Sequence, residues 1–104
     1  MDSLIAFLEV AELILAWVLQ NATQKDLVQP GHIFPIIANA GGLKKRRGHT
    51  EGSLELMKLA GLSESAVLCE VMNPDGTMAR GESLNAFAKA QNLHCISIEE
   101  IACA

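Results

Sequence analysis

The stretch KKRRGHTE, residues 44–51, joins a basic loop to the start of a predicted helix, and the rest of the chain is organised around it. It holds four of the eight Lys and Arg residues of a chain whose net charge is −4. A helix start offers free backbone N–H groups and the positive end of the helix dipole, so donors and cations converge there. The pattern predicts a phosphate site, and the alternative is an ordinary solvated loop.

The segments on either side of this stretch set its local structure. Residues 39–42 (NAGG) form a flexible break before it. A helix is expected from about residue 50 to residue 60, ending at Gly61 as the residue after the cap. Gly52 weakens this helix, but the missing side chain would let a ligand approach the backbone.

Short apolar runs predict strands at residues 32–37, 66–72 and 95–98. Residues 73–76 (NPDG) indicate a turn that leads into a short partner strand over residues 77–80. Ser83 is expected to cap a further helix. Strands and helices therefore alternate after residue 30, which predicts an α/β or α+β domain with a mixed sheet flanked by helices.

The chain begins with an apolar run. Residues 4–19 are apolar except at Glu9 and Glu12, and Asp2 and Ser3 can cap a helix. Two carboxylates argue against a membrane span, and a secretory signal would need a basic start. The run predicts a buried helix, or one that covers a surface left open by something missing from the chain.

Length and composition limit the functional classes. The 104 residues suit one small domain with an aliphatic core. The net charge argues against general nucleic-acid binding, because such a surface is usually basic over a whole face. Cys69, Cys95 and Cys103 are odd in number and widely spaced, which indicates reduced thiols in a cytoplasmic protein.

Three titratable residues, His32, Glu70 and His94, lie outside the basic stretch. Considered alone, His32 fits a structural histidine better than a catalyst. Glu70 is a carboxylate in an apolar run, so it needs a partner or a task, or else it faces solvent at a strand end. His94 has no neighbouring residues at metal-ligand spacing and is expected to be structural.

From Asp26 to about Ile101 the chain resembles the C-terminal half of 3,4-dihydroxy-2-butanone-4-phosphate synthase, an enzyme family of riboflavin biosynthesis. The resemblance rests on a series of motifs in the order and spacing of the family, which together are specific. They are PGHIFP at 30–35, GG at 41–42, Arg46 with GHTE at 48–51, LM at 56–57, LAG at 59–61, VLCE at 67–70 and DGTMAR at 75–80.

The resemblance implies conversion of D-ribulose 5-phosphate into 3,4-dihydroxy-2-butanone 4-phosphate and formate with Mg²⁺ or Mn²⁺, by enolisation, loss of water, skeletal rearrangement and release of the terminal carbon. It implies that Glu70 is a substrate-contacting acid or base and that His32 is the second residue needed for chemistry. His49 would be a metal ligand. The residues around the substrate and its phosphate would be Arg46, Arg47, Gly48, His49 and Thr50.

The sequence also departs from the family. The family's acidic loop, an Arg-Glu followed by further carboxylates, has no match within residues 1–23. Arg47 stands where a small residue is usual. We therefore expect a single partial synthase-like domain over residues 1–104, family-like over 26–101, with little activity alone and a homodimeric state as in the family. The alternative is a non-catalytic relative that serves as a phosphosugar-binding or dimerisation module, in either case without nucleic-acid or membrane partners.

Overall fold

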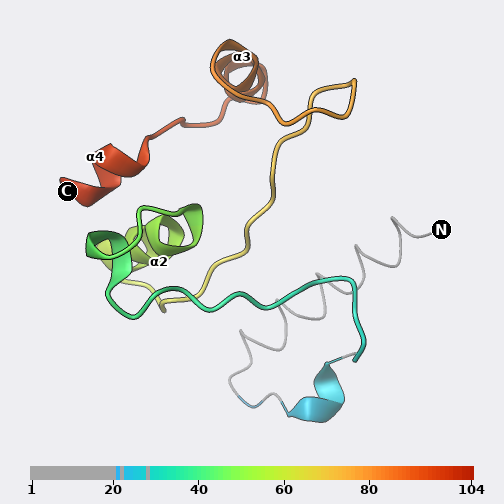
Figure 1. Cartoon of the computed structure of the whole chain (residues 1–104), viewed down its shortest axis with the longest axis vertical. Helices are drawn as coiled ribbons and strands as arrows, with labels where there is room; N and C mark the ends of the chain where they lie inside the picture. Colours follow the sequence, from blue (N-terminus) through green and yellow to red (C-terminus); the bar gives the residue numbers. More distant parts are fainter. Residues whose placement is uncertain (1–20, 22, 28) are drawn as a thin grey trace. The chain divides into compact units, whose positions relative to one another are not determined.

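The computed structural model describes residue 21 and residues 23–27 and 29–104 (Figure 1). The chain divides into two compact units, Met1–Ile36 and Ile37–Ala104. The apolar helix predicted over residues 4–19 lies outside the described residues. Within the described part of the chain, no helix is long and apolar enough to cross a membrane.

The described part of the first unit contains the short 3₁₀ helix η1, Gln24–Asp26. Thr23 caps it, because its side chain accepts from the N–H of Lys25 and its own N–H donates to Asp26 Oδ2 at 2.7 Å. The reciprocal bonds explain why the polar residues after Asn21 form a turn of helix.

The second unit contains four described helical elements in the order η2 (Gly42–Lys44), α2 (His49–Leu59), α3 (Glu82–Ala90) and α4 (Ile98–Ala102). The helix predicted over residues 50–60 is therefore confirmed as α2 within one residue at each end. Gly61 follows it with a φ of 72°. Its N–H bonds to Lys58 O, and the N–H of Leu62 bonds to Met57 O, which closes the end of the helix.

Two of the three buried apolar residues of this unit lie where α2 packs against η2 and α4, and the third, Ala88, lies on α3. Leu43 of η2 and Ile101 of α4 are each 8% exposed. Gly52 of α2 is buried, and a Cβ built on it would lie 2.5 Å from Ile98 Cδ1. The absent side chain of Gly52 therefore makes room for α4 and not, as expected, for a ligand.

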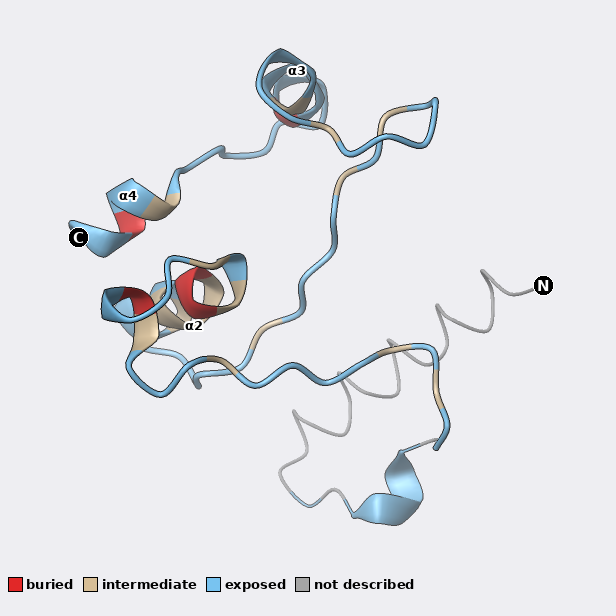
Figure 2. Ribbon diagram, in the orientation of Figure 1, coloured by how far each residue is buried: buried red, intermediate tan, exposed pale blue. Residues whose placement is uncertain are grey.

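The predicted mixed sheet is wrong for the described residues. Their only bridge is an isolated antiparallel pair, Met72 with Met78, around the expected turn at 73–76. Residues 66–71 are extended and largely exposed (Figure 2). A short apolar run predicts an extended backbone, but a sheet also needs a second segment that supplies donors and acceptors. Among the described residues, such pairing is limited to the Met72–Met78 bridge and the bond from the N–H of Ala79 to Val71 O at 2.8 Å.

Two local predictions are also corrected. Residues 95–98 were expected to form a strand, but Ser97 caps α4 and Ile98 is its first residue. The N–H of Ser97 bonds to Glu100 Oε2 at 2.7 Å, and this capping box favours helix over strand. Gly81, not Ser83, is the cap of α3, because the hydroxyl of Ser83 bonds to backbone atoms of Arg80.

Candidate functional site

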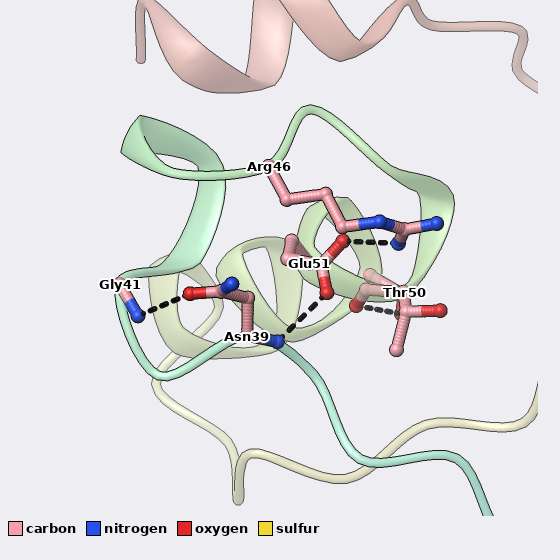
Figure 3. Close-up of polar contacts among 6 residues, drawn as sticks. Asn39, Gly41, Arg46, Thr50 and Glu51 are labelled. Atoms are coloured by element: carbon pink, nitrogen blue, oxygen red, sulfur yellow. Dashed lines mark hydrogen bonds and ion pairs between the residues drawn. The ribbon is translucent and has the colours of Figure 1, made fainter.

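The basic stretch leaves η2 and enters α2 at Gly48, within the second unit (Figure 3). Asn39 starts the preceding turn: its Oδ1 accepts from the N–H of Gly41 at 2.9 Å, and its carbonyl accepts from the N–H of Gly42 at 2.9 Å. The N–H of Arg46 then bonds to Gly42 O at 3.0 Å. The loop that carries the cations is thus folded by its own backbone before it reaches the helix.

Glu51, in the first turn of α2, holds both ends of this loop. Its Oε1 accepts from Arg46 Nη1 at 2.7 Å, and its Oε2 accepts from the backbone N–H of Asn39 at 2.9 Å. Figure 3 shows the carboxylate of Glu51 between these two partners. The Glu51 side chain is 2% exposed and the Arg46 side chain 62%. The anchor is therefore buried while the guanidinium still faces solvent.

These contacts lower the pKa of Glu51 below its usual value. The hydrogen bond from the backbone of Asn39 is the largest cause, and the Arg46 guanidinium adds to it, while partial burial acts in the opposite direction. The carboxylate is consequently ionised at neutral pH. An ionised, buried carboxylate with a charged partner and a backbone donor meets the requirement that buried charge be paired.

Gly48 makes the contact between Arg46 and Glu51 possible. It is the N-cap of α2 in an extended conformation and forms no side-chain cap. A Cβ on Gly48 would lie 2.5 Å from Glu51 Oε1 and still closer to Arg46 Nη1. His49 and Thr50 are the first residues of the helix, His49 exposed and Thr50 half-buried. The predicted run from Arg46 to Thr50 is thus continuous around one helix start.

Arg47 takes a different environment from that of Arg46. Its Nη1 lies 3.8 Å from Glu99 Oε1 of α4, and both side chains are more than half exposed. Such a pair contributes little because solvent screens it and both side chains must be ordered. Arg47 is available at the surface, but it is not anchored as Arg46 is.

The described residues do not by themselves fit a divalent-metal site. His49 offers one exposed imidazole, and the carboxylate of Glu51 is engaged by Arg46 and Asn39. Mg²⁺ and Mn²⁺ prefer several oxygen ligands. Over residues 23–27 and 29–104, no group of three or more His, Cys, Asp or Glu residues could hold an ion. We therefore derive no chemical step through a metal.

The structure does not test whether the two other predicted site residues lie near this cluster. His32 is an exposed residue of the first unit, so its distance from the basic loop is not defined. Glu70 belongs to the second unit and is exposed in the extended segment over residues 66–71. The structure thus brings together the residues from Arg46 to Thr50 and leaves His32 and Glu70 as sequence-based predictions.

A hollow of about 620 Å³ lies beside the anchored loop on the side of η2. Its walls come from residues 37–44, from α2 and from the loop after α2, and they carry both acids and bases. Glu51 lines it, whereas Arg46 and His49 do not. The hollow is therefore separate from the predicted phosphate-binding run.

The sequence analysis assigned no role to Asn39 and included Glu51 only as the last residue of the GHTE motif. The pattern that could have found the contact is a glutamate three residues after a glycine N-cap. That position puts a carboxylate at the helix start, where free N–H groups and cations gather. The partner N–H of Asn39, twelve residues earlier, could not be identified from spacing.

A guanidinium held at a helix start, followed by an imidazole and a hydroxyl, defines a candidate anion site of the kind enzymes use for phosphorylated substrates. The family model for 3,4-dihydroxy-2-butanone 4-phosphate synthase matches residues 5–103. The chain belongs to this family, whose members are lyases of riboflavin biosynthesis. The resemblance stated from the motifs is thereby confirmed.

Individual relatives give the extent of the match. The Pseudomonas putida synthase is 56% identical over 82 residues, which cover 79% of this chain and 38% of the relative. The synthase of Shewanella sp. strain MR-4 is 52% identical over 88 residues, 85% of this chain and 41% of the relative. The chain thus spans about two-fifths of the length of these curated relatives.

Solved structures agree with this assignment. A synthase structure from Candida albicans is 41% identical with a TM-score of 0.72, over 79% of this chain and 42% of that chain. A two-domain synthase from A. baumannii is 49% identical with a TM-score of 0.68, over 77% of this chain and 24% of that chain. The described backbone therefore follows part of the family's fold.

Proposed function

We propose that this chain supplies the phosphate-binding side of a 3,4-dihydroxy-2-butanone-4-phosphate synthase site, acting on D-ribulose 5-phosphate. The observation that carries the proposal is the exposed guanidinium of Arg46, anchored through a buried carboxylate at the start of α2. Lys44, Lys45 and Arg47 are its neighbours in the sequence and add further positive charge to the loop. A phosphate would meet both the cations and the free N–H groups of the first turn.

The roles of the remaining residues follow from the family motifs and are part of the same proposal. Thr50 contacts the substrate phosphate. His49 contributes one ligand to a divalent ion such as Mg²⁺ or Mn²⁺. Glu70 moves a proton on the substrate, and His32 is the second proton-transferring group. A carboxylate and an imidazole are suited to this work because both exchange protons near neutral pH when their surroundings adjust them.

A divalent ion bound to His49 would need further oxygen ligands. In this proposal, a complementary polypeptide supplies them. Two observations support this. The matched region covers only 38% of the Pseudomonas putida relative, and several large apolar side chains of this chain are exposed. In the second unit they include Ile37 at 95%, Leu68 at 45% and Met72 at 61%. Apolar surface of this kind is typical of interaction sites.

The test is formate release from D-ribulose 5-phosphate with Mg²⁺, measured for the chain alone and for the chain mixed with the part of the Pseudomonas putida relative that has no counterpart here. We expect no turnover from either polypeptide alone and turnover from the mixture. In the mixture, Glu70→Gln should reduce the rate by about 10²-fold or more, as expected for a proton-transferring group. Glu64→Gln removes an equal charge from another exposed position and should leave the rate unchanged.

The alternative is a non-catalytic module that binds a phosphosugar or mediates assembly. It is favoured by the same exposed apolar side chains together with the incomplete metal site among the described residues. The two proposals differ in the mixture. Binding of D-ribulose 5-phosphate without formate release, although the two polypeptides associate, would reject the catalytic proposal and retain the module.

A further inference from the structure

We propose that Glu51 is a positioning residue, which holds the guanidinium of Arg46 in place for an incoming phosphate. The inference rests on the proposed phosphosugar function and assigns a task to a residue that the family motifs left without one. It starts from the two bonds that Glu51 accepts, one from Arg46 Nη1 at 2.7 Å and one from the N–H of Asn39 at 2.9 Å.

These two bonds close the loop from both ends. Asn39 begins the turn that precedes η2 and Arg46 lies after η2, so one buried carboxylate is bonded at both limits of the segment from Asn39 to Arg46. The bond from Arg46 uses Nη1, whereas a guanidinium carries five N–H donors. With 62% of its side chain exposed, Arg46 can present further donors to an anion while Glu51 holds it.

The neighbouring glycine supports the same interpretation. A Cβ at Gly48 would overlap Arg46 Nη1 and Glu51 Oε1, so both side-chain ends would have to shift from their observed positions. A glycine cap stabilises a helix less directly than Ser or Asp, because it offers no side-chain acceptor. Glycine at position 48 therefore leaves room for the Arg46–Glu51 contact, although Ser or Asp would be a better N-cap for α2.

The negative charge of Glu51 beside Arg46 also repels an incoming anion. This repulsion must be compared with the benefit of holding the Arg46 guanidinium in place. Lys44, Lys45 and Arg47 keep the loop positive after Glu51 has offset one charge. An unanchored arginine would lose rotamer freedom on binding, and holding it in advance removes that cost. Because the Glu51 carboxylate points at Arg46 and Asn39 and is only 2% exposed, anchoring is its larger effect.

The first measurement follows Arg46 directly and needs no substrate. Nuclear magnetic resonance of the Arg46 guanidinium should show slowed exchange of its protons with water in the unmodified chain. Glu51→Gln should restore fast exchange. Glu55→Gln, which removes the same charge one turn further along α2, should leave the Arg46 resonance unchanged. Circular dichroism of each variant reports whether α2 is intact.

The second measurement is calorimetry with D-ribulose 5-phosphate and with inorganic phosphate. Glu51→Gln should weaken binding by about tenfold, the lower end of the losses seen when groups that orient metal ligands are removed. Arg46→Ala should weaken it at least as much. In the Arg46→Ala background, Glu51→Gln should have no further effect, because a residue that acts through Arg46 is not additive with it. If Glu51 had only a structural role, Glu51→Gln would weaken phosphate binding further in the Arg46→Ala variant.

A second variant covers the case in which Glu51→Gln unfolds α2. In Gly48→Ala, the added Cβ would overlap Arg46 Nη1 and should push the guanidinium away from Glu51. The variant should show the same fast proton exchange and the same weaker phosphate binding. An Arg46 resonance that neither variant changes would overturn the inference while leaving the proposed function intact. A chain with anchored Arg46 that binds neither ligand would overturn the proposed function, and the inference with it. Stronger phosphate binding by Glu51→Gln would also overturn the inference, because charge would then outweigh anchoring.

Discussion

The loop from Asn39 to Glu51 holds five predicted site residues and the extended segment over residues 66–71 holds one, Glu70, and the two regions differ in how they are held. The loop is closed by a buried carboxylate that accepts two hydrogen bonds. Among the described residues, the backbone N–H groups of 66–71 find no backbone acceptor, and Val67 is 50% exposed. The loop carries its own partners, whereas the extended segment requires partners from outside the described residues.

The largest expected effect concerns amide hydrogen exchange in these two regions. In the chain alone, the amide of Asn39 should exchange at least about 100-fold more slowly than the amides of residues 66–71, because exchange reports local opening. Addition of the complementary part of the Pseudomonas putida relative should protect residues 66–71 and change Asn39 little. The measurement is hydrogen exchange followed by mass spectrometry or nuclear magnetic resonance.

A scrambled polypeptide of the same composition provides the control for that experiment. Equal protection in the two regions of the chain alone would remove the distinction between them. Protection of residues 66–71 by the scrambled polypeptide would mean that the exposed apolar side chains bind without selectivity.

The same difference explains what could be predicted from the sequence. The helix at 49–59 and its Gly61 end depend on neighbours within a few residues, so local patterns identified them. The sheet depended on pairing between distant segments, which a short apolar run does not specify. Residues 32–37 and 66–72 were therefore predicted as extended, but their incorporation into a sheet was wrong.

The site follows the same division. The run from Arg46 to Thr50 was predicted as a phosphate site because a helix start was expected there; the structure has that helix start, and the site stays a prediction. The contact of Glu51 with Asn39 joins residues twelve positions apart and was missed. His32 and Glu70 remain predictions, because their proximity to the loop depends on long-range placement.

Gly61 follows the C-cap of α2 and lies between the loop and the extended segment in the sequence. Its replacement should have the next largest effect. Its φ of 72° is unfavourable for a residue with a Cβ. Gly61→Ala should destabilise α2 by about 1 kcal/mol, since this cost exceeds the entropy that Ala removes from the unfolded chain. Exchange of the α2 amides with solvent measures the change.

The end of α3 supplies the matched control. Asn92 occupies the equivalent position with a φ of 53°, and the N–H of Leu93 bonds to Ala88 O as that of Leu62 bonds to Met57 O. Gly61→Asn should therefore cost less than Gly61→Ala, because Asn tolerates this conformation better than Ala. Equal losses for the two variants would show that the backbone conformation of Gly61 is not the cause.

The smallest expected effect is a dependence of the anchored loop on acid pH. The hydrogen bond from Asn39, followed by the interactions with Arg46, lowers the pKa of Glu51. A carboxylate whose pKa is lower in the folded state stabilises folding above its unfolded value of about 4.3. That contribution should be lost as the pH falls from there through the lowered folded value.

Protection of the Asn39 amide should accordingly decrease below that pH, while residues 66–71 remain unprotected throughout. Glu51→Gln should remove this part of the pH dependence. It should leave the part due to Glu100, whose pKa is lowered by its capping bonds with Ser97 at the start of α4. Glu51 lies on α2 and Glu100 on α4, so the amides that lose protection show which of the two carboxylates is being protonated. An unchanged profile at Asn39 in Glu51→Gln would mean that another group holds the loop, and the contrast with the extended segment would need a different physical basis.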